Sequence, residues 1–289
     1  MREIKIINIK DKEYPKLLRE TPDPPEVLFI KGELNPAELC FAIVGTRRSS
    51  PYGKQAALEI AGDLTAAGLT IVSGLAPGID TFCHQAVIER RKRTIAVLGT
   101  GLDEKSIYPK ENIELARKIL ELGGALISEY PPGTPGSQFT FPRRNRIISG
   151  ISLGVLVVEA KQKSGALITA NWAKKQGKKV FAVPGSIYFL NSRGPNYLIK
   201  QQGAKLIDSA NDILKELNLP LKGKAEAITG ENKEENLILD SLKEESLYID
   251  KIIEKTKLPA AAVASTLAVL EIKGKVRNLG GNIYAISNR

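Results

Sequence analysis

The sequence predicts an α/β protein: an extended Rossmann-like, mostly parallel sheet with helices on both faces, plus a small C-terminal winged-helix domain. Apolar runs of strand length alternate with helical patterns from about residue 39 to 218. Several of these runs are apolar throughout, as expected of strands that helices cover on both faces. After residue 231 the pattern changes to three short helices and a hairpin with a glycine turn, which predicts the winged helix.

Four parts are expected along the chain. Residues 1–38 contain one clear strand, at 27–32, and are predicted to be a lead-in that packs on the next domain. Residues 39–218 form the Rossmann-like domain, residues 219–231 a linker and residues 232–289 the winged helix. The expected strands of the large domain lie near residues 40–44, 70–73, 94–98, 125–128, 153–158, 179–183 and 204–207. The expected helices of the winged helix lie at 234–242, 249–255 and 259–273, before a hairpin at 275–286.

The composition excludes several classes of protein. The chain has 289 residues, 43% hydrophobic and 26% charged, which is ordinary for a soluble globular protein. There is no run long enough to span a membrane and no signal-peptide core, so we expect a cytoplasmic protein without membrane contact. Cys40 and Cys83 lie in apolar patterns and predict buried, reduced thiols. No cluster has metal-ligand spacing, so neither a metal nor a cofactor is expected.

The positive charge is unevenly distributed. The net charge is +10, yet residues 223–289 contain ten basic and ten acidic residues. The whole excess therefore lies in residues 1–222. An excess of this size indicates a polyanionic partner such as nucleic acid, and it places that partner on the Rossmann-like domain.

The turn after the first strand of this domain suggests a phosphate site. Gly45 allows a tight turn, Arg47 and Arg48 supply positive charge, and Ser50-Pro51 is a good start for the following helix. The N-terminus of a helix favours an anion because its N–H groups are unpaired. The alternative is an ordinary strand-to-helix turn with two solvated arginines.

Similar polar loops follow the other strands. They carry Gly, Ser, Thr, Arg or Lys, and in a parallel sheet they all meet at the carboxyl edge, where ligands bind. The most suggestive cluster is 143–146 (Arg-Arg-Asn-Arg), which follows Phe139 and Phe141. Arginines hold phosphates and aromatic rings stack on bases, so the cluster favours nucleic acid over a solvated helix start.

An enzyme is the rival interpretation. Asp80 and His84 are spaced to share a helix face, and an Asp–His pair could perform acid–base chemistry, although a structural role is favoured for a histidine among apolar residues. Glu159 ends a central strand, where a catalytic carboxylate or a structural hydrogen bond fits equally well. The chain lacks a Walker lysine motif and a G-x-G-x-x-G turn after the first strand, which disfavours an ATPase and a dehydrogenase. A nucleoside monophosphate phosphoribohydrolase remains the alternative.

The winged helix is electrically neutral and its third helix is rich in alanine at Ala260, Ala261, Ala262 and Ala264. Affinity for duplex DNA depends mostly on cation–phosphate contacts. We therefore favour a protein-contact or accessory role over groove reading.

The ordered motifs closely resemble those of the DNA-processing protein A (DprA, also called Smf) family. Five of the matching segments are 43–47 (Ile-Val-Gly-Thr-Arg), 73–76 (Ser-Gly-Leu-Ala), 99–103 (Gly-Thr-Gly-Leu-Asp), 141–146 (Phe-Pro-Arg-Arg-Asn-Arg) and 164–170 (Ser-Gly-Ala-Leu-Ile-Thr-Ala). In order and spacing the matches cover about residues 14–208.

The resemblance implies an extended Rossmann-like domain that binds single-stranded DNA without sequence preference, and we expect this binding to be non-enzymatic. It also implies a homodimer that protects incoming DNA and loads the RecA recombinase on it during natural transformation. The five arginines of the two clusters would hold phosphates, and Phe139 or Phe141 would stack on a base. The expected DNA-binding residues are Gly45, Arg47, Arg48, Ser73, Gly74, Phe139, Phe141, Arg143, Arg144, Asn145, Arg146, Lys163, Ser164 and Thr169.

Overall fold

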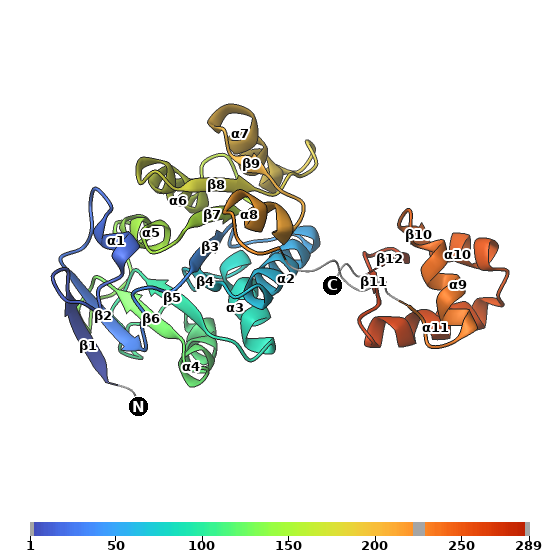
Figure 1. Cartoon of the computed structure of the whole chain (residues 1–289), viewed down its shortest axis with the longest axis horizontal. Helices are drawn as coiled ribbons and strands as arrows, with labels where there is room; N and C mark the ends of the chain where they lie inside the picture. The colour runs from blue at the N-terminus through green and yellow to red at the C-terminus, as the bar shows by residue number, and fades with distance from the viewer. Residues whose placement is uncertain (1–2, 222–228, 287–289) are drawn as a thin grey trace. The chain divides into compact units, whose positions relative to one another are not determined.

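The chain forms two compact units, residues 1–221 and 222–289 (Figure 1). The computed structural model describes residues 3–221 and 229–286. Most of the expected linker, and the last three residues of the expected winged helix, lie outside the described residues. Each unit has its own hydrophobic core, since no core cluster contains residues of both.

The first unit is built on a nine-stranded sheet with the order β1-β2-β6-β5-β4-β3-β7-β8-β9. Strands β3 to β9 pair in parallel, whereas β1 and β2 are antiparallel to their neighbours, so the expected mostly parallel sheet is confirmed. The strands are β1 (Ile4–Asn8), β2 (Val27–Gly32), β3 (Cys40–Val44), β4 (Thr70–Ser73), β5 (Thr94–Leu98), β6 (Ala125–Ser128), β7 (Gly154–Val157), β8 (Lys179–Ala182) and β9 (Lys205–Leu206).

Helices cover both faces of this sheet (Figure 1). One face packs against α2 (Pro51–Ala66), α3 (Ile79–Glu89), α4 (Ile113–Glu121) and α8 (Ala210–Glu216). The other packs against α1 (Lys16–Arg19), α5 (Thr140–Gly150), α6 (Gly165–Lys175) and α7 (Arg193–Gln202). Two short 3₁₀ helices, η1 (Lys110–Asn112) and η2 (Leu190–Ser192), precede α4 and α7.

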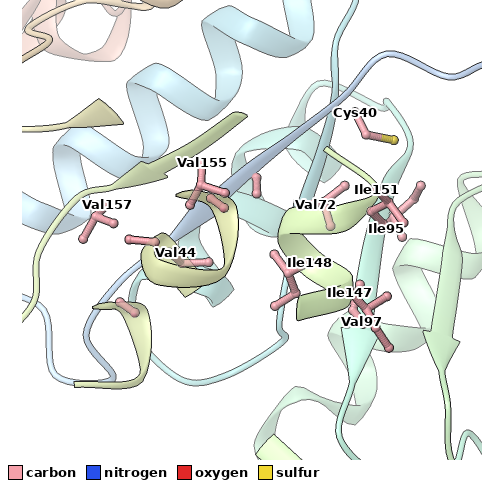
Figure 2. Close-up of a cluster of buried hydrophobic side chains, with 14 of the residues drawn as sticks. Cys40, Val44, Val72, Ile95, Val97, Ile147, Ile148, Ile151, Val155 and Val157 are labelled. Carbon is pink, nitrogen blue, oxygen red and sulfur yellow. The ribbon is translucent and has the colours of Figure 1, made fainter. Parts of the chain in front are cut away.

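The two layers explain why the central strands are apolar throughout. Alternate residues of a strand point to opposite faces. Val44 of β3 and Val72 of β4 therefore lie on one face of the sheet, in the same core cluster as Ile147 and Ile148 of α5 (Figure 2). Their neighbours in sequence face the helices on the other side of the sheet, as Phe41 and Ile43 do. The inner positions of such a strand are therefore apolar, and the buried polar residues Ser73 and Thr94 stand at strand ends with hydrogen-bonded hydroxyl groups.

The lead-in takes part in the sheet itself. Strand β2 pairs with β6, and β1 pairs with β2 at the edge of the sheet. The sequence predicted β2 but not β1. Strand β1 has neighbours on one side only and no residue of it is fully buried, so it lacks the apolar run that marks the inner strands.

The second unit has the expected three helices and hairpin. It consists of α9 (Lys233–Ser241), α10 (Ile249–Thr256) and α11 (Ala260–Ile272), with a sheet in the order β10-β12-β11 made of β10 (Leu247–Tyr248), β11 (Val276–Asn278) and β12 (Ile283–Ile286). The short β10 was not predicted because it has only two residues. Leu267 and Leu270 of α11 pack with Ile238 of α9 and Val276 of β11 in one core.

Candidate nucleic-acid interface

A cleft of about 750 Å³ opens at the carboxyl edge of the large sheet. It lies between the loop after β3 and the loop after β7, two adjacent parallel strands. From β3 the chain continues into α2 on one face, and from β7 into α6 on the other. This is the topological switch point of a doubly wound sheet, where the loops separate and leave a crevice for a ligand.

The first wall of the cleft is the turn from Gly45 to Ser50. A side chain at Gly45 would lie 2.4 Å from Ile79, so only glycine fits where this turn crosses α3. Arg47 and Arg48 are exposed at its tip. The Arg47 guanidinium carbon lies 5.6 Å from the centre of the Phe141 ring, a cation–π contact that holds the arginine over the cleft.

The N-terminus of α2 is already occupied by a side chain of the protein. The buried Glu159 carboxylate accepts hydrogen bonds from the Ser50 N–H at 2.9 Å and from the Ser50 hydroxyl at 2.5 Å. Ser50 in turn caps the helix by accepting from the Gly53 N–H, as predicted. The expectation that a phosphate binds at the start of α2 is therefore corrected, because the Glu159 carboxylate occupies that position. Two roles are predicted for Glu159, a catalytic carboxylate and a structural hydrogen bond. These contacts support the structural one.

The N-terminus of α6, on the second wall, is not capped in this way. Ser164 stands at the N-cap position without a side-chain cap, and its buried hydroxyl has no hydrogen-bond partner among the described residues. Lys161 and Lys163 are exposed just before it, and the buried Thr169 lines the cleft one turn further on. This terminus, with its unpaired N–H groups and two lysines, is the better position for an anion.

The floor of the cleft is α5, whose three arginines have different surroundings. Arg143 is exposed, 3.4 Å from Glu129. Arg144 is buried and donates to the carbonyl oxygens of Gly74, at 2.7 Å, and of Val97. Burial lowers the pKa of Arg144 to about 10, with the Asp80 carboxylate acting in the opposite direction, so this arginine is still charged at neutral pH. Its side chain lines the cleft and connects Gly74, directly after β4, to Val97 of β5.

Arg146 does not line the cleft. Its side chain is 1% exposed and forms ion pairs with Glu129 at 2.5 Å and with Asp23 at 3.2 Å. It also donates to the Asp23 carbonyl oxygen, which ties α5 to the lead-in. The expectation that Arg146 holds a phosphate is corrected, since its guanidinium is buried and paired with Glu129 and Asp23.

The other residues expected to contact DNA are also either buried inside the protein or placed at the cleft. Ser73 is fully buried and donates to the Ile43 carbonyl oxygen at 2.6 Å, and Gly74 is buried against the Arg144 guanidinium, so neither offers a surface to DNA. Asn145 is buried at the cleft and donates to the Gly165 carbonyl oxygen at 3.1 Å. Phe139 is 75% exposed, whereas Phe141 is half-buried.

The candidate acid–base pair is not formed. Asp80 accepts from the N–H groups of Gly74 and Ala76, and burial raises its pKa although the Arg144 charge opposes this. His84 is fully buried, with Nδ1 2.9 Å from the Thr94 hydroxyl, and burial lowers its pKa to about 3. Each side chain therefore has its own structural partners. Within the described residues there is no His, Cys, Asp or Glu cluster that could hold a metal ion.

Sequence reasoning missed Lys161. It is exposed on the second wall, two residues before Lys163. The signal was present, because both lysines lie in the same loop after β7.

In the part of the chain that the structure describes, no helix is long and apolar enough to cross a membrane.

Several lysines among the described residues of the winged helix are paired with acidic side chains. Lys273 binds Glu231 and Glu235 at 2.7 Å each, and Lys275 lies 3.4 Å from Glu231. The exposed side of α11 carries small or apolar residues, including Ala264, Ala268 and Ile272. That the winged helix has a protein-contact or accessory role rather than reading a duplex stays a prediction.

These features define a doubly wound α/β protein with a cationic cleft at its switch point and an added winged helix. The profile described as DNA recombination-mediator protein A matches residues 5–218, and that described as DprA winged helix domain matches residues 222–282. The chain belongs to the DNA recombination-mediator protein A (DprA) family.

Named relatives agree with this assignment. The chain is 40% identical to Protein Smf of Escherichia coli over 278 residues, 93% of the chain and 74% of that protein. It is 48% identical to the DNA processing protein DprA of Bacillus subtilis over 216 residues, 74% of the chain and 71% of the relative.

Two solved structures are also similar. DprA of Streptococcus pneumoniae matches with a TM-score of 0.69 and 42% identity, over 76% of each chain. DNA processing protein A of Helicobacter pylori matches with a TM-score of 0.66 and 29% identity, over 75% of this chain and 98% of that one. The Helicobacter pylori structure is described by its unique mode of binding single-stranded DNA.

Proposed function

We propose that this chain binds single-stranded DNA in the cleft between β3 and β7 and acts as a recombination mediator. The observation that carries the proposal is the set of exposed cations around the cleft: Arg47, Arg48, Lys161 and Lys163 line it, and Arg143 stands at its edge on α5. Exposed cations bind phosphates, whereas the buried Arg144 and Arg146 position α5.

A single strand fits this site better than a duplex. Phe139 is exposed beside the cations, and Arg47 stacks on Phe141. An unpaired strand presents the faces of its bases to such rings, and this stacking is tolerant of sequence. The similarity to the Helicobacter pylori protein supports the same substrate.

The later steps of the proposed function are protection of incoming DNA and loading of the RecA recombinase in natural transformation, by a cytoplasmic homodimer. The family description, recombination mediator, and the resemblance of the motifs support these steps. The protein acts by binding rather than by catalysis, since the candidate acid–base residues Asp80, His84 and Glu159 are held by structural hydrogen bonds.

Fluorescence anisotropy with labelled oligo-dT, compared with duplex of the same length, tests the proposal. We expect the wild type to prefer oligo-dT and the Arg47→Ala/Lys163→Ala variant to bind it weakly. Removing two phosphate contacts makes the negative slope of log affinity against log salt shallower by about 1.4 for a single strand. The charge-matched control is Lys10→Ala/Lys12→Ala, which removes two exposed lysines of the lead-in. Equal affinity in the two variants, or an affinity independent of salt, would contradict the proposal.

A further inference from the structure

The loop that joins β8 to α7 exposes four consecutive large apolar side chains. Ile187, Tyr188, Phe189 and Leu190 are 75%, 86%, 66% and 55% exposed. A contiguous apolar surface of this kind is uncommon on a soluble protein and marks a contact site. None of these residues lines the cleft.

Hydrogen bonds connect this loop to both walls of the cleft. The Asn191 side-chain amide donates to the Arg48 carbonyl oxygen at 2.9 Å, and the Ala160 N–H donates to the Asn191 carbonyl oxygen at 2.7 Å. At the start of the loop, the Tyr52 hydroxyl of α2 donates to the Pro184 carbonyl oxygen at 2.7 Å. Strand β8 also lies next to β7, so the loop continues the same carboxyl edge.

The charge around the loop favours nucleic acid as its occupant over a second copy of the chain. The cations next to the loop are those at the same carboxyl edge of the sheet. Arg193 is exposed directly after the loop, and Lys161 follows Ala160 on the neighbouring loop. In a two-fold dimer the same positive surface would face itself, and like charges repel. A polyanion meets no such repulsion.

We propose that Tyr188 and Phe189 form a second stacking platform, on which bases of the single strand lie after it leaves the cleft past Arg48. This inference rests on the proposed function. Phe141 packs beside Gly99, which directly follows β5, whereas Tyr188 and Phe189 follow β8. The path from the end of β5 to the end of β8 crosses four strand spacings, about 20 Å. The site therefore holds several nucleotides, with phosphates on the cations and bases on rings at both sides.

The test is the Tyr188→Ala/Phe189→Ala variant, measured by anisotropy against oligo-dT and against an abasic strand of the same length. We expect a loss of about tenfold or more in affinity for oligo-dT, as for other aromatic stacking positions, and nearly unchanged affinity for the abasic strand, which has phosphates but no bases. The matched control is Ile6→Ala, which removes an exposed apolar side chain on β1, at the opposite edge of the sheet.

The outcomes separate this inference from the proposed function. If Arg47→Ala/Lys163→Ala weakens binding and the aromatic variant binds oligo-dT like the wild type, the platform is overturned and the proposed function stands. If the wild type does not bind oligo-dT, both fail. Light scattering compares the molar mass of the wild type with that of the Tyr188→Ala/Phe189→Ala variant. A lower mass in the variant would identify a second copy of the chain as the occupant and overturn the inference of a stacking platform. An unchanged mass with reduced oligo-dT affinity supports it.

Discussion

Ser50 and Glu159, which are 109 residues apart in sequence, form a paired contact in which the backbone N–H and the hydroxyl of Ser50 both donate to the Glu159 carboxylate. The contact connects the end of β7 to the first residue before α2. It also neutralises the positive end of the α2 dipole from inside the protein. A side chain at Gly53 would lie 2.3 Å from this carboxylate, so the sequence at the start of α2 is matched to it.

We predict that Glu159→Gln lowers the free energy of unfolding by about 1–3 kcal/mol, because a charge-assisted hydrogen bond at a helix N-terminus is lost. Affinity for oligo-dT is expected to be retained, since Glu159 is buried and does not line the cleft. Urea denaturation of the variant and of the exposed control Glu13→Gln measures the difference. An unchanged stability would show that the carboxylate charge is not needed at this helix start.

His84, the single histidine of the chain, predicts a pH dependence of stability. Its pKa is lowered to about 3 in the folded protein by burial, against about 6.5 in the unfolded chain. Between these pH values the unfolded state binds one more proton than the folded state. The contribution of His84 to the free energy of unfolding is therefore fully present above pH 6.5 and is lost as the pH is lowered. From pH 7 to 5.5 the expected loss is about 1 kcal/mol.

The variant His84→Gln isolates this contribution, because glutamine keeps a polar partner for Thr94 but does not titrate in this range. The raised pKa of the Asp80 carboxyl acts in the opposite direction, and it is common to both proteins. Urea denaturation at pH 7 and pH 5.5 is therefore compared between the wild type and the variant. The hypothesis fails if the two proteins lose the same stability on acidification.

Arg146 and Arg143 are predicted to have opposite phenotypes although they share one helix. Arg146→Ala leaves Glu129, whose side chain is 8% exposed, without its closest ion-pair partner, and breaking a buried pair costs about 3–5 kcal/mol. Arg143→Ala removes an exposed partner of the same carboxylate, so its effect on stability is at most about 1 kcal/mol. Arg143→Ala is instead expected to weaken oligo-dT binding.

Thermal unfolding and anisotropy, measured on both arginine variants, provide the comparison. The milder variant Arg146→Lys keeps the charge but not the two-pronged pairing geometry of arginine. It replaces Arg146→Ala in both measurements if that variant does not fold. If folded Arg146→Lys lost DNA affinity without losing stability, Arg146 would be a phosphate contact after all.

The sequence predicted the sheet and the cleft because both depend on local pattern. Central strands such as β5 are apolar on both faces, and polar loops after parallel strands must meet at one edge. It could not distinguish Arg143 from Arg146, because their roles depend on Glu129 and Asp23, which pair with them only in the folded chain. Likewise, nothing near Ser50 in the sequence indicates that Glu159 fills the anion position at α2.

The exposed aromatic loop could not be predicted either. Residues 187–190 read as an apolar run, which usually indicates a buried segment. Their exposure follows from the place of the loop, which leaves the sheet after β8 and runs into η2, whose first residue is Leu190. Burial is a property of the assembled layers and not of the run itself.

The last prediction concerns the winged helix. Deleting residues 223–289 is expected to leave the affinity for oligo-dT within about twofold of the wild type, and the salt slope unchanged. The deleted segment has no net charge, and Lys273 and Lys275 are paired with Glu231 and Glu235. The remaining unit keeps its own core, so it is expected to fold. Anisotropy across a salt series compares the two proteins directly, with Arg47→Ala/Lys163→Ala as the reference for a real loss. A deletion that abolished binding would move the DNA site to the winged helix. Unchanged binding would keep the site on the first unit, because a segment without net charge adds little to the electrostatic part of DNA affinity.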